Sequence, residues 1–373
     1  MTASPAALLD QTRTFAREVV APGALVWERE RRLGHEALSQ AAGMGLTGLQ
    51  VPPSDGGLGH PYSVKAQVAE ILGGADFGFA MSLLNTQNVA HRLTRDAPGL
   101  VPRYLDDLLT ARRVGCTALT EPGAGSDFGA IRTTAAADGD GWRLNGEKAW
   151  IINAVAADLI VVYAQTQPGS GGRGIASFLV DGQRDGFTRT DPARMSAQHS
   201  IGAGGFILND YRVEPGEMIR PAGEAFKSAL TDINGARAYV AAMCCGMVAE
   251  CLGIVAEYGN RRETFSKPLI GHQGWRWKLA DADTDLAAAR ALVRDAAALI
   301  DAEKDAMYPA ARAKVFATRM AERHLPALAQ CMGAEGLKES YPFGRHMIGV
   351  RAGSFTDGST EILLERLAAQ FRA

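Results

Sequence analysis

The segment Thr117-Ala-Leu-Thr-Glu-Pro-Gly-Ala-Gly-Ser-Asp127 stands near the end of the first third of the chain. An apolar run typical of a strand, Val114 to Leu119, leads into it. Pro122 presets the chain direction, while Gly123 and Gly125 permit backbone shapes that let a ligand approach the main chain closely. Free N–H groups and a hydroxyl in such a turn suit a phosphate or the polar edge of a ring. Taken alone, the segment is equally compatible with an ordinary glycine-rich loop between two strands.

A second segment follows, Trp142-Arg-Leu-Asn-Gly-Glu-Lys-Ala-Trp-Ile-Ile-Asn153. Its Asn145-Gly146 pair between apolar runs predicts a β-hairpin turn, which places Trp150 on the strand after the turn. Together the two segments resemble the flavin-binding middle domain of the acyl-CoA dehydrogenase family. Two further blocks in the last third also fit this family, so the resemblance covers nearly the whole chain.

Length and composition are those of an ordinary globular protein. The 373 residues are enough for two or three structural units, and 47% are hydrophobic. A net charge of -2 with scattered arginines does not indicate a basic surface for binding nucleic acid. No apolar run approaches the ~20 residues that span a bilayer, and residues 1–9 do not read as a signal peptide. The five cysteines lack a zinc-like spacing, so we expect no metal site, reduced thiols and a cytoplasmic protein, with Cys244 and Cys245 in the core.

The order of patterns predicts a fold that is mostly α with a central β domain. We expect an N-terminal helical domain over residues 1–113, a small β-barrel-like middle domain over 114–218 and a C-terminal four-helix bundle over 219–373. The expected helices are 8–26, 33–44, 62–75, 77–95, 100–113, 225–258, 268–304, 308–332 and 359–371. The expected middle strands include 159–164, 175–180 and 205–209.

Some polar and glycine-rich residues have both a structural and a functional interpretation. Asn85, Gln87 and His91 lie among apolar residues on an expected helix, where internal hydrogen bonds are favoured over a substrate contact. No helix begins after the glycine-rich segment 169–174, so a surface turn is favoured over a phosphate-binding loop.

The family resemblance implies FAD as cofactor and assigns the first segment to it. The main chain of Thr117, Leu119 and Thr120 would line the polar edge of the flavin ring. Gly125 belongs to the same turn, and Ser126 would reach the cofactor phosphate and also lie near the substrate.

Trp150 would pack against the flavin ring, although core packing is the alternative for this residue taken alone. The family usually has Thr or Ser two residues later, with a hydroxyl near flavin N5. This chain has Ile152 there, which has no donor. The departure implies a shift in flavin reactivity.

The block Arg262-Glu-Thr-Phe-Ser-Lys-Pro-Leu-Ile-Gly-His-Gln273 resembles the family segment Arg-x-x-Phe-Gly-Lys-Pro. The planar fork of Arg262 suits a pyrophosphate, and Phe265 and Gln273 would also meet the cofactor. In the family these groups reach a cofactor bound mainly by a neighbouring subunit, which implies a homo-oligomer, either a dimer or a tetramer. The alternative is a helix–turn–helix with a solvated arginine.

A related block, Gln330-Cys-Met-Gly-Ala-Glu-Gly336, resembles the family segment Gln-x-x-Gly-Gly-x-Gly. It adds Gln330 and Gly333 to the cofactor-binding residues. Ala334 replaces a glycine, which is a small change.

The catalytic base is expected in Phe355-Thr-Asp-Gly-Ser-Thr-Glu-Ile362, where many family members have Glu-Gly-Thr with that Glu as base. Asp357 falls on this position. A base must come within roughly 3 Å of the proton it removes, and a displacement on the order of 1 Å can cost ~100-fold in rate. The shorter side chain therefore implies a changed substrate or reaction. Asp357 could instead begin the following helix, while Ser359 and Glu361 are assigned to the cofactor, with Glu361 as the fallback base.

The thioester arm would meet Asn234-Gly-Ala-Arg237, which stands where the family has Asp-x-x-Arg. Arg237 would hold the pantetheine or phosphate region, and Asn234 and Gly358 would contribute to the same slot. The arm can come from coenzyme A or from an acyl carrier protein.

Three functions remain open at this point. The first is an FAD-dependent dehydrogenase of the α,β carbons of an acyl thioester, with electron-transfer flavoprotein or another acceptor as partner. The second is an oxidase or a specialised biosynthetic oxidation on the same fold, acting on a carrier-bound or small polar substrate. The third is a bundle protein that binds acyl carriers without turnover, and the absence of flavin would mark it.

Overall fold

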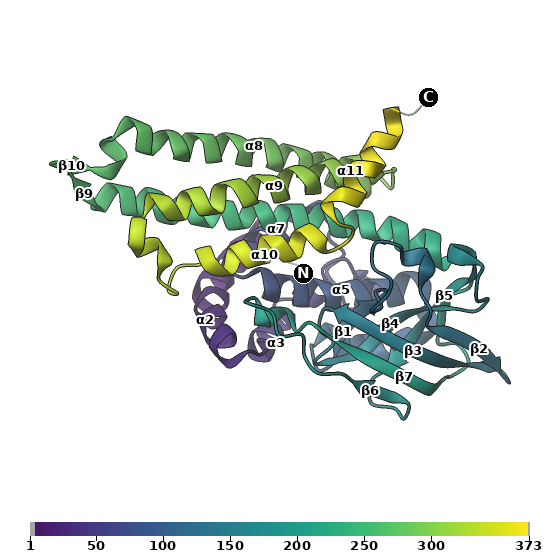
Figure 1. The fold of residues 1–373 in the computed structure, drawn as a ribbon. Helices are drawn as coiled ribbons and strands as arrows, with labels where there is room; N and C mark the ends of the chain where they lie inside the picture. Colours follow the sequence, from purple (N-terminus) through teal and green to yellow (C-terminus); the bar gives the residue numbers. More distant parts are fainter. Residues whose placement is uncertain (1–3, 372–373) are drawn as a thin grey trace.

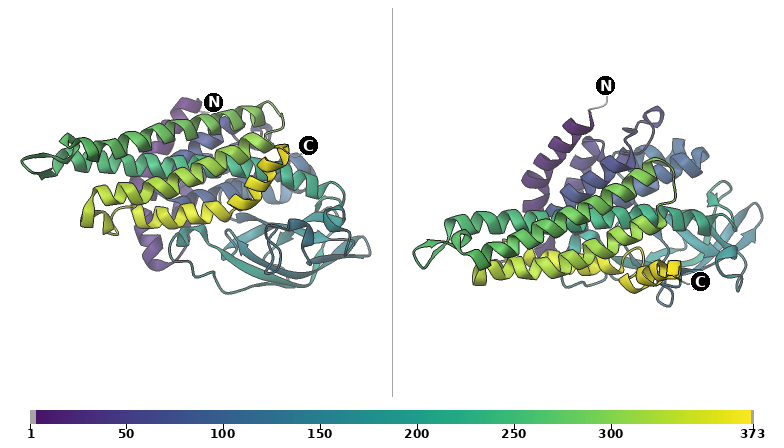
Figure 2. Two further views of the ribbon diagram at one scale, coloured as in Figure 1. Left: turned by 45° about the horizontal axis from the view of Figure 1, so that its top comes forward. Right: turned by 90° about the horizontal axis from the view of Figure 1, so that it is seen from above.

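The computed structural model describes residues 4–371 (Figures 1 and 2). Its N-terminal third is helical, as expected. The helices are α1 (Pro5–Phe15), α2 (Ala21–Glu30), α3 (His35–Gly43), α4 (Tyr62–Ala75), α5 (Phe77–Asp96) and α6 (Val101–Leu109). A single π turn, Ala16–Val20, joins α1 to α2, so that the expected first helix forms one rod. Residues 1–3, part of the segment that does not read as a signal peptide, lie outside the described chain.

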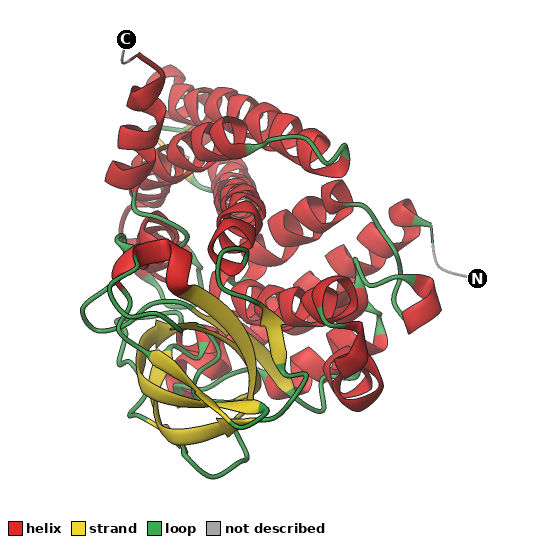
Figure 3. Cartoon of the chain, turned by 90° about the vertical axis from the view of Figure 1, so that its right-hand side faces the viewer, coloured by secondary structure: helices red, strands yellow, loops and turns green. Residues whose placement is uncertain are grey.

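The middle third forms one eight-stranded sheet. Its strands are β1 (Val114–Ala118), β2 (Thr134–Asp138), β3 (Gly141–Ile151), β4 (Ala157–Gln165), β5 (Ile175–Asp181), β6 (Phe187–Arg189), β7 (Gly204–Val213) and β8 (Met218–Arg220). The order is β6-β7-β3-β2-β4-β5-β8, and β1 runs parallel to β4. Figure 3 shows the strands curving around a shared interior, which confirms the barrel-like prediction.

The predicted hairpin turn at Asn145-Gly146 is wrong. Both residues lie inside β3, and the turn is the pair 139–140, because Asp138 pairs with Gly141. The register of β3 against β7 shifts at this point. The Asn145 side chain accepts a hydrogen bond from the N–H of Asp210 at 2.8 Å, and a Cβ at Gly146 would lie 2.7 Å from the Cα of Thr133. Asn145 and Gly146 therefore belong to a register shift within the sheet rather than to a turn.

The last third is a helical bundle. It contains α7 (Ala225–Arg261), α8 (Gln273–Asp301), α9 (Met307–Cys331), α10 (Phe343–Phe355) and α11 (Thr360–Ala368). Helices α7, α8 and α9 lie side by side, α10 packs on α9 and α7, and α11 packs on α9 (Figures 1 and 2). The predicted C-terminal helical bundle is confirmed: its four expected helices correspond to α7, α8, α9 and α11, while α10 was not predicted. Gly344, Gly349 and Gly353 lower the helix propensity of its sequence, and packing on α9 overrides them.

Helix α7 contradicts the expectation that no apolar run approaches the length of a membrane span. It contains an 18-residue window of mean hydropathy 1.9. That window is 72% buried inside the protein, where α4, α8, α9 and α10 pack around the helix. The apolar composition of α7 is therefore accounted for by its central position in the core.

Most of the residues expected to be internal are internal, but His91 is only half-buried. Cys244 and Cys245 are buried, and all five cysteines are free thiols. The amide of Asn85 donates to the carbonyl of Met81 at 3.1 Å, and that of Gln87 donates to the carbonyl of Leu46 at 2.8 Å. The glycine-rich segment 169–174 forms the tip between the antiparallel strands β4 and β5, as predicted.

Candidate active site

Asp357 lies in the short loop between α10 and α11, in left-handed backbone conformation with φ of 57°. Two buried cations hold this loop. Lys314 of α9 donates from Nζ to the carbonyl oxygens of Thr356 and Gly358, the second at 2.6 Å. Arg237 of α7 donates from Nε to the carbonyl oxygen of Asp357 at 3.0 Å. Three successive carbonyl groups are thus fixed from the bundle, which pins the strained residue in place.

The side chain of Asp357 is left free by this arrangement. Its Oδ2 is buried and has no hydrogen-bond partner among residues 4–371. Burial raises the pKa of the carboxyl above its usual range, although the charges of Lys314 and Arg237 oppose the rise. The alternative role, beginning the next helix, belongs to Ser359, whose side chain caps α11 by accepting from the N–H of Ile362. A carboxyl with a raised pKa and an unused oxygen is suited to accept a proton.

Two tyrosines stand close to this carboxyl. Tyr62, at the start of α4, donates its hydroxyl to the carbonyl of Gly235 on α7. Tyr239 lies one turn further along α7. Burial raises the pKa of both phenols, and the charge of Asp357 raises each further. Helices α4 and α7 therefore each contribute a buried tyrosine within electrostatic reach of the carboxyl.

The residues predicted for the thioester slot lie beside the loop that carries Asp357. Arg237 is 3% exposed, and its Nη1 donates to Oδ1 of Asn234 at 2.8 Å while its Nε is used by Asp357. Nη2 has no partner in the described chain, and it lies 3.5 Å from where a Cβ at Gly358 would stand. The structure thus brings Asn234, Arg237 and Gly358 together around the base loop.

The glycine-rich turn of the first segment is held from within by Glu121. The Glu121 carboxylate accepts from the backbone N–H groups of Arg132 and Thr133, at 2.6 Å and 3.0 Å, and from Nζ of Lys148 at 2.8 Å. Lys148 also donates to the carbonyl of Leu119, and the N–H of Ala149 donates to the carbonyl of Thr120. Because these two carbonyls are occupied, a ligand at the turn would meet the N–H groups of Leu119 and Thr120.

The outer side of the same turn is open. A Cβ at Gly123 would meet nothing within 4 Å, and one at Gly125 would only touch Thr120 at 4.0 Å. Ser126 is exposed. Trp150, although a large apolar ring, is 69% exposed and has a left-handed φ of 59°. An exposed indole plate beside free amide and hydroxyl groups fits the flavin ring and phosphate of FAD.

Ile152 follows the exposed tryptophan and is partly buried against the helical core. Thr117 lies within β1, opposite Val161 of β4. The structure therefore gives no new hydrogen-bond donor at either position. The interpretation of Trp150 as a core residue is ruled out by its exposure.

The remaining predicted cofactor residues lie elsewhere. Helix α7 ends beside a two-stranded ribbon, β9 (Glu263–Thr264) and β10 (Lys267–Pro268), at the far end of the bundle from the sheet (Figure 1). Phe265 at the tip of this ribbon is 92% exposed. The other residues of this group, on or beside α7, α8 and α9, are exposed as well: Arg262, Gln273, Gln330 and Gly333. One chain therefore carries two separate groups of predicted cofactor residues.

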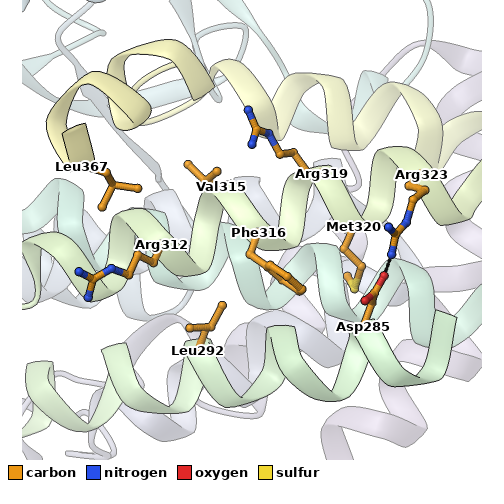
Figure 4. Close-up of a pocket in the computed structure, with 9 residues that line it drawn as sticks. All are labelled: Asp285, Leu292, Arg312, Val315, Phe316, Arg319, Met320, Arg323 and Leu367. Carbon is orange, nitrogen blue, oxygen red and sulfur yellow. Dashed lines mark ion pairs between the residues drawn. The ribbon is translucent and has the colours of Figure 1, made fainter. Parts of the chain in front are cut away.

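A groove of about 560 Å³ runs along the bundle between α8, α9 and α11 (Figure 4). Its apolar lining consists of Leu292, Val315, Phe316, Met320 and Leu367. An ion pair between Asp285 and Arg323 closes one side. None of the predicted site residues lines it, so this groove is separate from the base loop and from the exposed tryptophan.

Sequence reasoning missed several residues that build the site. Lys314, Tyr62, Tyr239, Glu121 and Lys148 were not singled out. The clearest signal was a charged residue in an otherwise apolar pattern, as for Lys314 in Ala-Arg-Ala-Lys-Val-Phe-Ala. Such a residue faces the core only when a buried partner satisfies it.

Comparison with known proteins identifies the family. Models of the N-terminal, middle and C-terminal domains of acyl-CoA dehydrogenase match residues 2–97, 116–211 and 223–371. The human mitochondrial short-chain specific acyl-CoA dehydrogenase is 31% identical over 357 residues, which is 95% of this chain and 87% of the relative.

Solved structures agree with this. Butyryl-CoA dehydrogenase from Megasphaera elsdenii superposes with a TM-score of 0.94 at 28% identity, covering 100% of this chain and 99% of its own. A chain solved in a study of the electron transferring flavoprotein of Acidaminococcus fermentans has a TM-score of 0.94 at 27% identity, with the same coverage.

The chain belongs to the acyl-CoA dehydrogenase family. This confirms the predicted fold class, the FAD cofactor and an oxidoreductase that acts on the CH–CH group of an acyl-CoA.

Proposed function

We propose that the protein dehydrogenates an acyl thioester at its α and β carbons, with Asp357 removing the α-proton. The observation that carries this proposal is the buried, unpartnered Oδ2 of Asp357 in a loop held by two cations. The raised pKa of this carboxyl matches a group that must take up a proton and hold it away from water. Asp357 is thereby preferred to Glu361, which is exposed.

FAD, when bound, supplies the acceptor for the hydride that leaves the β carbon. The chain's own residues hold and orient the reactants. The N–H groups of Leu119 and Thr120 and the hydroxyl of Ser126 would bind polar edges of the cofactor, and the ring of Trp150 would cover its flat face. Lys314 and Arg237 act as positioning residues because they hold the backbone on both sides of the base.

The shorter aspartate is accommodated by its backbone. The left-handed φ of Asp357, followed by a φ of 99° at Gly358, is fixed by the contacts to Lys314 and Arg237. Removing either contact would therefore release the backbone on one side of the carboxyl.

The partners follow from the same assignments. We infer that the substrate is an acyl-CoA, or an acyl group on a carrier protein with the same arm, and that an electron-transferring flavoprotein or another acceptor reoxidises the flavin. We also propose a homo-oligomer, because the β9–β10 ribbon lies at the opposite end of the chain's structure from strand β3, which carries Trp150. The buried free thiols fit a cytoplasmic protein.

The test is a visible absorption spectrum of the purified protein followed by anaerobic titration with acyl-CoA esters. We expect a yellow protein that bleaches with one class of ester, and an Asp357→Asn variant that stays yellow and does not bleach. Glu361→Gln tests the fallback base, and because this carboxylate is exposed the variant should still bleach. A variant that bleaches without the Asp357 carboxylate would refute the base assignment.

A second candidate, an oxidase on the same fold, is favoured by Ile152. This side chain provides no donor where a hydroxyl would tune the flavin. The two candidates differ in how fast oxygen reoxidises the reduced enzyme. Fast reoxidation in air would support the oxidase, and slow reoxidation without an added acceptor would support the dehydrogenase.

A further inference from the structure

Lys65 of α4 is a buried cation with an unused donor. Only 3% of its surface is exposed. Its Nζ donates to the amide oxygens of Gln50 at 2.9 Å and Asn88 at 2.6 Å, which are both neutral. An ammonium group has three N–H donors, so the third has no acceptor among residues 4–371. When it is protonated, Lys65 is thus a positive charge in the interior whose hydrogen bonds are incomplete.

The acidic group that acts on Lys65 is already committed to other cations. Asp232 accepts from Arg92 at 2.5 Å and from Arg95 at 2.9 Å. By contrast, the buried Lys148 has Glu121 at 2.8 Å. Burial lowers the pKa of Lys65 to about 7. The charge of Asp232 raises this pKa, but the charge of Arg95 lowers it again. A buried charge without a counter-ion is costly, and a ligand carboxylate would remove that cost.

Lys65 and the base share two neighbours. Nζ of Lys65 lies 6.0 Å from the ring centre of Tyr62 and 5.6 Å from that of Tyr239. These are the tyrosines whose pKa rises with the charge of Asp357. Asn88, which holds Lys65, also donates to the hydroxyl of Tyr239 at 3.4 Å. Tyr62 and Tyr239 therefore connect the surroundings of the ammonium with those of the carboxyl that removes the proton.

We propose that Lys65 is a specificity-determining residue that binds a carboxylate at the far end of the acyl chain. This inference rests on the proposed function, since it places the thioester end of the same substrate at Asp357. The unused N–H of Lys65 would donate to the carboxylate, while the amide oxygens of Gln50 and Asn88 keep the ammonium in place. An acyl chain that ends in a methyl group would leave the ammonium unpaired in the interior, which disfavours it.

The test compares paired esters on the FAD-loaded protein. Succinyl-, glutaryl- and adipyl-CoA are measured against butyryl-, pentanoyl- and hexanoyl-CoA as second-order rates of anaerobic flavin bleaching. We expect at least one carboxylate-ended ester to react about 10- to 100-fold faster than its methyl-ended partner, the range of a hydrogen bond to a charged group. Lys65→Met should abolish this preference, and Lys65→Arg should keep part of it.

A second readout separates recognition from a structural role. Met has a similar length and no charge, so Lys65→Met should melt at the same temperature as the wild type or higher. The carboxylate-ended ester that reacts best should raise the melting temperature of the wild type but not of the variant. Lys227→Met removes one exposed charge and should change neither property.

The inference is overturned if the wild type shows no preference for a carboxylate, or if the preference survives in Lys65→Met. The experiment distinguishes a failure of this inference from a failure of the proposed function. If methyl-ended esters bleach the flavin without any advantage for their partners, the dehydrogenase stands and the role of Lys65 falls. If no ester of either kind bleaches the flavin, dehydrogenation of acyl-CoA esters is itself refuted, and this outcome is distinct from the loss of the carboxylate preference.

Discussion

Arg237 holds the backbone of Asp357 rather than its carboxylate: Nε of Arg237 lies 3.0 Å from the main-chain oxygen of Asp357. A salt bridge would have lowered the pKa of the carboxyl and consumed its oxygens. The observed contact leaves Oδ2 free and the loop fixed. The main-chain oxygen of Asp357 thus fixes the position of the loop, while its free Oδ2 keeps the affinity for a proton.

Lys314→Met should slow catalysis without removing the flavin. The change leaves the carbonyls of Thr356 and Gly358 without their buried donor, so the loop around Asp357 loosens. We expect kcat to fall by about 10- to 100-fold, because small displacements of a reacting group are costly. The unsatisfied carbonyls should also lower the free energy of unfolding by about 1–3 kcal/mol.

The measurement is the flavin content, the melting temperature and the rate of flavin bleaching in each variant. Arg312→Met is the matched control, because this exposed residue lies on the same helix and contacts Gln370 rather than the loop. A Lys314→Met protein with unchanged kcat would show that the loop keeps its geometry without the lysine.

Asp357→Asn should stabilise the protein near neutral pH. A carboxyl whose pKa is raised in the folded state stabilises that state fully below its unfolded pKa, and this contribution is lost as the pH rises through the folded pKa. The amide of the variant does not ionise. The melting temperature of the variant should therefore exceed that of the wild type near pH 7, and the gap should narrow towards pH 4 or below.

Thermal melting of both proteins from acid to neutral pH measures this difference. Glu361→Gln is the control, because this carboxylate is exposed and its pKa is lowered by hydrogen bonds from its own backbone N–H and from Ser359. An Asp357→Asn variant that is less stable than the wild type at neutral pH would mean that the charged carboxylate is satisfied in the folded protein.

The predictable part of this structure was contiguous in sequence. The loop with Asp357 and the two segments with Ser126 and Trp150 could be proposed as site segments because the residues of each stand next to one another in recognisable order. Lys314 and Tyr62 come from helices that are distant in sequence, and no local pattern reveals that they converge on one loop. The turn predicted at Asn145-Gly146 was wrong for the same reason. The glycine is required by the close approach of Thr133, which is a tertiary contact.

Glu121→Gln should weaken both the fold and the cofactor site. The change leaves Lys148, which is fully buried, without its counter-charge. Burial has already lowered the pKa of Lys148 to about 8, and Glu121 is the group that opposes this. Breaking a buried pair costs about 3–5 kcal/mol, and the glycine-rich turn that Glu121 holds should lose affinity for FAD.

Denaturant unfolding and flavin absorbance measure the two effects. Combining Glu121→Gln with Lys148→Met should recover part of the stability, because removal of both charges leaves neither one unpaired. The pair is not responsible for holding the turn if the single variant unfolds like the wild type and keeps its full FAD content.

The separation of the two groups of cofactor residues predicts that inactive variants complement each other. Asp357→Asn disables the group near the sheet, while Arg262→Ala combined with Gln273→Ala disables the group near the β9–β10 ribbon.

In a mixed oligomer whose sites are shared between subunits, one site combines both defects and another combines both intact groups. Random pairing of equal amounts should therefore restore about a quarter of the wild-type activity, since about half of the pairs are mixed and each has one intact site. Co-expression of differently tagged chains measures this in the unfractionated mixture, and the isolated mixed species should have about half of the wild-type activity because one of its two sites is intact. The control is co-expression of Asp357→Asn with Trp150→Ala, two defects in the same group, which should restore nothing because every site then carries one of them. If the mixed species of the first pair is also inactive, each chain binds its cofactor alone.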